Sequence, residues 1–232
     1  LIADALRSES IDVRRRDLVL ESIARMSLEA TPETWREPLV ALIRDGDLSA
    51  MLAVKNLKDR SFDSALGELA HNTRRILAAR VAAADVLVGW GGALDAPLFE
   101  MLLAELAANP NDENAKPERL LAAARVLAAA PLTVAQRQSL VPIIRDASPL
   151  VLPVLLNAFE NDTDPNTGLR LIGELRRSES SGNLPAARLE QVLRGYPADV
   201  QRLVLAQGAR LARRGRAPRP SARARRQERV RQ

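Results

Sequence analysis

The chain offers very few side chains that can act as nucleophiles, redox groups or metal ligands. Its 232 residues include no cysteine and a single histidine, His71. The lack of cysteine excludes disulfides, thiolate metal sites, iron–sulfur clusters and covalently attached c-type haem. A zinc or haem site would need His71 together with carboxylates, and a lone surface or satisfied histidine is the simpler interpretation. We therefore predict a non-enzymatic chain with no catalytic, cofactor-binding or metal-binding residue.

Acidic pairs and a glycine-rich run are the other candidates for chemistry. Three pairs fall in turns or first helical turns: Glu33 and Glu37, Asp112 and Glu113, Asp162 and Asp164. Carboxylates there stabilise helix N-termini, whereas general acid–base catalysis would need a surrounding pocket. The run Gly89–Gly92 lacks the Lys-Ser/Thr ending of a phosphate loop. We interpret all of them as turns and caps.

Arginine is concentrated at the carboxyl end. Residues 210–232 carry ten arginines and one glutamate, a local charge of +9, which leaves residues 1–209 with a net charge of −4. Such an arm can bind RNA, DNA or an acidic surface through counterion release, although without aromatic residues it offers no base stacking. The candidate polyanion contacts are Arg213, Arg214, Arg216, Arg219, Arg223, Arg225 and Arg226.

Two further interpretations of this end stay open. Residues 213–232 can be a disordered, solvated tail with no dedicated partner. They can also be an out-of-frame translation, because 31 arginines against three lysines indicate a GC-rich genome. The domain organisation that we predict is a folded region over 1–212 and a disordered arginine-rich tail over 213–232.

The elements that must position these residues are helices. Hydrophobic residues make up 47% of the chain and aromatic residues 3%, so the core must consist of Leu, Ala, Val and Ile. Apolar residues recur with a helical period in 12–28, where Leu18 and Ile23 are expected on one side. Thr31 and Asp47 are expected as N-caps and Gly46 as a left-handed C-cap. No apolar run approaches 18 residues, so no membrane span is predicted.

The helix-breaking and capping residues Pro, Gly, Asn and Asp divide the chain into about twelve helices. They are expected at 12–28, 32–45, 48–59, 62–88 (one helix or two), 97–108, 117–129, 133–147, 149–161, 165–177, 185–195 and 198–212. Helix 149–161 is apolar nearly all round and should be covered on several sides, with Leu152, Leu155, Leu156 and Phe159 in the core. Pro38, Pro142 and Pro153 should bend their helices.

Helices of similar length joined by short connectors must lie antiparallel to their neighbours. Equal pairs in series favour a particular all-α architecture, an α-solenoid of HEAT-like antiparallel helix pairs in which each pair covers the apolar face of the last. A compact, irregular α-helical bundle is the alternative.

A series of short motifs between 97 and 211 resembles a known family. The motifs are Pro97-Leu98-Phe99, Leu120–Leu127, Ala130–Thr133, Pro149-Leu150, Leu152-Pro153, Ala158-Phe159-Glu160, Gly168-Leu169 and Tyr196–Gln201. Their order resembles the HEAT-like helical region of the large membrane-bound dehydrogenase and haem-binding proteins of planctomycete-type bacteria. The resemblance implies a helical region between a propeller similar to sugar dehydrogenases and a cytochrome c domain, in an exported or periplasmic protein.

This chain departs from that family in its reactive groups. The family's haem is carried by a Cys-x-x-Cys-His motif, and this sequence has no cysteine and no propeller. The resemblance therefore implies a spacer whose redox chemistry lies in other domains, with no cofactor of its own. Because the first residue is Leu1, we also expect an internal piece of a longer protein.

Three functions follow as hypotheses. The leading one is a non-catalytic scaffold for protein–protein interaction, with protein partners or neighbouring domains of a longer chain. The second is a nucleic-acid-binding HEAT-like protein that uses the arginine-rich tail. The third, an enzyme such as a HEAT-fold DNA glycosylase, would need aromatic and acidic residues together, and the chain holds only Trp35, Trp90, Tyr196 and three phenylalanines. The oligomeric state is left open.

Overall fold

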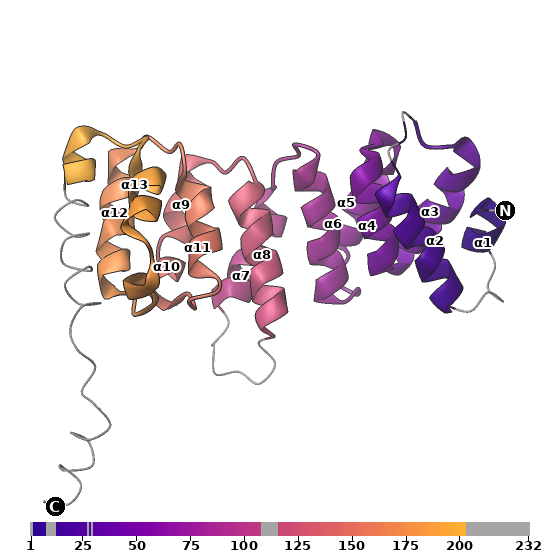
Figure 1. The fold of residues 1–232 in the computed structure, drawn as a ribbon, viewed down its shortest axis with the longest axis horizontal. Helices are drawn as coiled ribbons and strands as arrows, with labels where there is room; N and C mark the ends of the chain where they lie inside the picture. Colours follow the sequence, from indigo (N-terminus) through magenta and orange to yellow (C-terminus); the bar gives the residue numbers. More distant parts are fainter. Residues whose placement is uncertain (1, 8–12, 27, 29, 108–115, 203–232) are drawn as a thin grey trace, which may run out of the picture. The chain divides into compact units, whose positions relative to one another are not determined.

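The computed structural model describes residues 2–7, 13–26, 28, 30–107 and 116–202 (Figure 1). Every regular element in these ranges is a helix, and no strand occurs in them. The all-α class predicted from the sequence is therefore confirmed. The chain divides into two compact units, unit 1 from Leu1 to Leu140 and unit 2 from Val141 onward. The seven candidate arginines and the acidic pair 112–113 lie outside the described residues.

Unit 1 is built from nine α-helices in its described part. They are α1 (Ile2–Arg7), α2 (Val13–Arg25), α3 (Glu33–Asp45), α4 (Leu48–Leu57), α5 (Asp63–His71), α6 (Leu77–Gly89), α7 (Ala96–Ala107), α8 (Pro117–Ala129) and α9 (Val134–Leu140). A short 3-10 helix, η1 (Arg60–Phe62), precedes α5.

The first eight of these helices form two layers. Helix α2 packs on α4, α4 on α6 and α6 on α8, while α1 packs on α3, α3 on α5 and α5 on α7. Each odd-numbered helix also packs on the even-numbered helix that follows it. We call α2, α4, α6 and α8 the even layer, and α1, α3, α5 and α7 the odd layer.

The caps of α3 and α4 show which residues end the first helix and start the second. Gly46 ends α3 with a φ of 84°, and its N–H donates to the Ile43 carbonyl at 2.9 Å, as expected for a left-handed C-cap. The Asp47 side chain accepts from the Ala50 N–H at 3.0 Å and starts α4. The N-cap predicted at Thr31 is wrong. Pro32 holds that position with an extended backbone and no side-chain cap, so the helix begins one residue after the proline.

The core of unit 1 lies between the two layers. Its largest fully buried side chains include Phe62, Leu39, Ile43 and Leu66 from the odd-layer side and Leu20, Ile23 and Met51 from the even layer. Segment 62–88 forms two helices, because the chain leaves the helical conformation at Asn72 and resumes it at Leu77.

Gly89–Gly92 ends α6, as predicted. The Trp90 indole N–H donates to the Lys55 carbonyl at 2.9 Å and ties this turn to α4. Gly91 has a φ of 85°, a left-handed conformation that favours glycine. A Cβ on Gly92 would lie 2.8 Å from the Leu87 carbonyl oxygen, so the backbone folds back too closely for any side chain. The run is a helix-ending turn.

Unit 2 contains one long helix and several short ones in its described part. They are α10 (Ile143–Asp146), α11 (Leu152–Leu155), the 3-10 helix η2 (Leu156–Phe159), α12 (Pro165–Arg177), the 3-10 helix η3 (Ser180–Asn183) and α13 (Ala186–Leu193). Residues 198–202 are also helical. The four residues predicted for its core, Leu152, Leu155, Leu156 and Phe159, are all fully buried.

Two predicted helices are broken at or near proline. The helix expected over 133–147 ends at Leu140 and resumes at Ile143, because Pro142 has no N–H and its ring clashes with the carbonyl four residues earlier. The helix expected over 149–161 starts only at Leu152, with Pro153 in its first turn, and tightens into a 3-10 helix after Leu155. The prediction of continuous, merely bent helices is wrong in both places. At Pro38 the helix is continuous, because α3 extends from Glu33 to Asp45.

A buried carboxylate organises the middle of unit 2. Asp162 is 3% exposed and accepts hydrogen bonds from the Thr163 N–H at 2.9 Å and the Tyr196 hydroxyl at 3.1 Å. Asp164 caps α12 by accepting from the Thr167 N–H at 2.8 Å. A Cβ on Gly168 would lie 2.6 Å from the Tyr196 ring. As predicted, Asp162 stabilises a turn and Asp164 caps a helix.

Candidate functional site

The outward side of the even layer carries exposed leucines. Leu18 of α2 is 59% exposed, and Leu48 and Leu52 of α4 are 50% and 55% exposed. The prediction that Leu18 belongs to the apolar side of its helix is wrong, because Leu20 and Ile23 are the buried residues of α2. Helices α2 and α4, which carry these three leucines, pack on each other.

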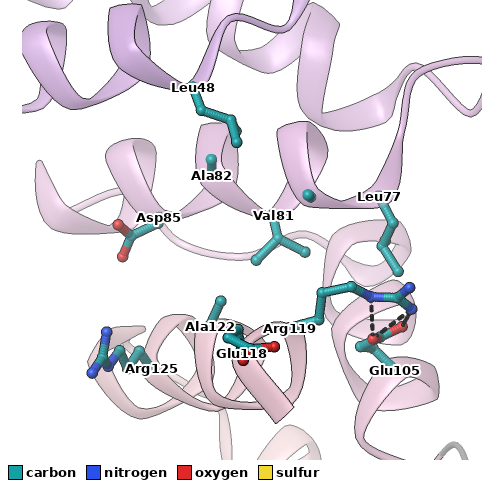
Figure 2. A pocket seen from close by; sticks show the side chains of 11 residues that line it. Leu48, Leu77, Val81, Ala82, Asp85, Glu105, Glu118, Arg119, Ala122 and Arg125 are labelled. Carbon is teal, nitrogen blue, oxygen red and sulfur yellow. Dashed lines mark hydrogen bonds and ion pairs between the residues drawn. The ribbon is translucent and has the colours of Figure 1, made fainter. Parts of the chain in front are cut away.

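Leu48 also lines a hollow of about 300 Å³, which is bordered by α4, α6, α7 and α8 (Figure 2). We call it the groove. Its apolar lining is Leu48, Leu77, Ala78, Val81, Ala82 and Ala122, and its charged lining is Asp85, Glu105, Glu118, Arg119 and Arg125. All of these residues belong to unit 1.

Small side chains give the groove its depth. Ala78 and Ala82 lie one turn apart on α6. Ala122 lies on α8 and lines the same hollow as Ala82 (Figure 2). Because alanine ends at Cβ, the backbones of α6 and α8 are within reach of an incoming side chain. Leu48 extends into the same space from α4 (Figure 2). An apolar hollow beside exposed leucines can accept an apolar group of a partner.

Two ion pairs hold the walls of the groove. The Arg119 guanidinium donates from Nε to Glu105 Oε1 and from Nη2 to Oε2, each at 2.8 Å. The Glu105 side chain is only 6% exposed, so the bidentate pair joins α7 to α8 in a largely dry setting. Lys55 Nζ lies 2.6 Å from Asp85 Oδ2 and joins α4 to α6.

The other two charges of the groove are unpaired. Among the described residues, no hydrogen bond or ion pair is made by the side chains of Glu118 and Arg125. Both side chains are exposed, and both lie on α8. In Figure 2, Glu118 lies near the Arg119–Glu105 pair, whereas Arg125 lies toward Asp85. The groove therefore has one free negative charge and one free positive charge.

His71, which is not part of the groove lining, connects two helices. Its Nδ1 lies 2.8 Å from the Gly67 carbonyl and its Nε2 lies 2.7 Å from Asp95 Oδ2. The Asp95 carboxylate also accepts from the Leu98 N–H at the start of α7. The hydrogen bond to the Gly67 carbonyl raises the pKa of His71, burial opposes this, and Asp95 raises it further. Protonated His71 thus links the end of α5 to the start of α7.

This link predicts a small pH dependence. A histidine pKa raised above its usual value of 6.5 stabilises the fold fully below that value and loses the contribution as the pH rises through the folded-state pKa. We expect His71→Gln to lower the free energy of unfolding by less than about 1 kcal/mol at pH 5.5 and by less at pH 8. Urea unfolding at both pH values measures this. An equal loss at the two values would contradict the protonated link.

The described residues include no group of three or more His, Cys, Asp or Glu side chains able to hold a metal ion. None of the described helices combines the length and apolar character that crossing a membrane requires. The seven arginines predicted as polyanion contacts lie outside the described ranges, so their prediction stays untested.

Sequence reasoning missed the groove and the leucines beside it. The available signal was Leu48 and Leu52 at i and i+4, a spacing that also describes a core-facing stripe. Compared with models of known protein families, with curated proteins and with solved structures, the chain has no match.

Proposed function

We propose that unit 1 is a non-catalytic scaffold that binds a partner protein through the even layer. The observation that carries this proposal is the exposed set Leu18, Leu48 and Leu52 on two helices that pack on each other, with Leu48 also lining the apolar groove. Leaving large leucines in water on two adjacent helices is unfavourable by about 25 cal/mol for each Å² of apolar surface. A partner that covers them recovers that free energy.

The proposed architecture is a HEAT-like α-solenoid of antiparallel helix pairs. Its support is the pattern of contacts in unit 1, where odd helices pack on odd, even on even, and each odd helix on the next even one. Stacked pairs give such a pattern, and a solenoid offers one layer as an extended binding surface.

The proposed context is a multidomain dehydrogenase–cytochrome c protein of the planctomycete type, of which this chain would be a fragment or truncated relative. Its support is the order of motifs between 97 and 211. In this setting the redox chemistry belongs to other domains and the chain is not an enzyme. The partner is then a neighbouring domain of a longer chain or another exported protein.

Photo-crosslinking tests the binding face. A benzophenone amino acid is placed at Leu52 on the even layer, or at Glu100, an exposed position of α7 in the odd layer, and the full chain is irradiated in cells of its source organism. We expect a defined adduct at Leu52 and none at Glu100, reproduced afterwards with the purified partner. Equal labelling at both positions, or no adduct at Leu52, would reject the proposed function.

The arginine-rich end favours a second candidate, a nucleic-acid-binding protein. Ten arginines within residues 210–232 would release counterions on binding, so affinity would fall steeply with salt. Fluorescence anisotropy with a single-stranded RNA and a DNA duplex, at two salt concentrations, compares the full chain with a form lacking 213–232. Absence of binding by the full chain, or unchanged binding after deletion, removes this candidate.

A further inference from the structure

We propose that the groove binds one amphipathic helix that runs antiparallel to α8 and carries an acidic residue and, seven residues later, a basic residue. The proposal rests on the proposed function, because it names the class of partner that the even layer takes.

The shape suits a helix with large apolar side chains. Ala78, Ala82 and Ala122 line the groove, and helices approach to about 8 Å where the contacting side chains are small and to about 10 Å where they are large. A partner helix can therefore insert leucine-sized groups between α6 and α8. Leu48, half exposed at the border, would pack against the same helix.

The other common modes of peptide recognition do not fit this surface. Strand addition needs an exposed sheet edge, and the described part of the chain has no strand. Recognition of proline-rich segments needs a groove lined by aromatic residues, and the lining of this groove contains none. Of these three modes, insertion of an apolar helix face into an apolar groove is the one that fits the lining.

The charges set the direction of the bound helix. Asp85 is paired with Lys55 and Glu105 with Arg119, which leaves Glu118 and Arg125 as the charges open to a partner. They lie seven residues apart on α8, about 10 Å along its axis. Residues i and i+7 of a partner helix have the same separation and lie on one face.

The partner's own dipole distinguishes the two directions. Acidic residues are favourable near a helix N-terminus and basic residues near its C-terminus. An antiparallel partner places its N-terminal acid beside Arg125 and its later base beside Glu118, which agrees with this preference. A parallel partner would need the opposite order, with each charge at the unfavourable end.

Two capped peptides of equal composition test this inference on the full chain. The first has glutamate followed seven residues later by arginine, two leucines between them on the same face and one leucine beyond each; the second exchanges the glutamate and arginine. The second peptide can pair both charges only by binding parallel, with each charge at the unfavourable end of its own helix. We therefore expect the first peptide to bind about five- to tenfold more tightly by fluorescence anisotropy. In the double variant Glu118→Gln with Arg125→Gln, this preference should largely disappear, because the groove no longer carries the two charges.

A substitution inside the groove distinguishes binding in the groove from non-specific binding elsewhere on the chain. Ala122→Gln fills the hollow with a longer side chain that still favours a helix, and we expect it to weaken the first peptide about tenfold. Ala129→Gln, at an exposed position of the same helix, is the matched control and should change nothing. Circular dichroism verifies that the variants keep their helices.

The peptide experiments and the photo-crosslinking experiment can fail independently of each other. Equal affinity for both peptides, an unchanged preference in the double variant, or full affinity in Ala122→Gln would each overturn the helix proposal. If Leu52 still forms its defined adduct, the even layer remains a protein-binding face with another mode of contact. Lack of both the adduct and peptide binding would remove the two proposals together.

Discussion

Replacing Phe159 with alanine is expected to lower the free energy of unfolding of unit 2 by about 3–5 kcal/mol. Phe159 is fully buried in η2, an element that packs against α11 and α13. Unit 2 contains no second phenylalanine, and its other large buried apolar side chains are mainly Leu and Ile. Removing the ring leaves a cavity that the surrounding leucines fill only in part.

Native-state hydrogen exchange of the amides in α11, η2 and α12 measures this loss within unit 2. The matched control is Leu169→Ala, which removes a large apolar side chain from a position of α12 that is 46% exposed. This control should change the stability by no more than about 0.5 kcal/mol. A loss at Phe159 as small as the loss at Leu169 would show that η2 is not covered in solution.

Replacing Arg119 with alanine is expected to cost unit 1 about 2 kcal/mol. Removing one partner of a fully buried ion pair costs roughly 3–5 kcal/mol, because the remaining charge has no compensation. The Glu105 side chain is 6% exposed and the Arg119 side chain 35%. Water therefore reaches part of the pair, and the expected cost is below the fully buried range.

Two comparisons test the interpretation of this ion pair by urea unfolding. Arg125→Ala removes an exposed arginine without a partner among the described residues from the same helix, and should have almost no effect. The double variant Glu105→Met with Arg119→Leu should recover most of the lost stability, because it leaves no unpaired charge. Equal effects of Arg119→Ala and Arg125→Ala would mean that the pair does not stabilise unit 1.

Local signals in the sequence predicted many element boundaries. Helices at 117–129 and 165–177 coincide with α8 and α12, since each begins with a proline that is pre-organised for the first helical position. Asp47 and Gly46 lie where their caps were expected for similarly local reasons. In contrast, a helix can either bend or break at Pro142. Which of the two occurs depends on packing against other parts of the chain, and the local sequence does not contain that information.

The candidate site was not predictable in the same way. Leu18 has the helical spacing of a core residue, yet the covered side of α2 is set by α4 and α1, which leaves Leu18 outside. The groove combines residues from Leu48 to Arg125, and no short window of sequence contains them. Only the packing of α6 on α8 turns Ala82 and Ala122 into its lining.

The polar candidates behaved as the sequence suggested where the structure describes them. Asp162 and Asp164 serve a turn and a helix cap, and Gly91 and Gly92 end a helix. His71 is a bridge between two helices with one carbonyl and one carboxylate partner. These hydrogen bonds give each of the residues a structural role in a turn, a cap or a bridge.

The affinity of the full chain for the partner captured at Leu52 tests the central claim most directly. Titration calorimetry compares the native chain with the double variant Leu48→Gln and Leu52→Gln, and with Glu100→Gln on the odd layer. We predict that the leucine variant binds at least about tenfold more weakly, as expected when buried apolar anchors of an interface are lost, and that Glu100→Gln binds like the native chain. Unchanged affinity in the leucine variant would contradict the assignment of the even layer as the binding face.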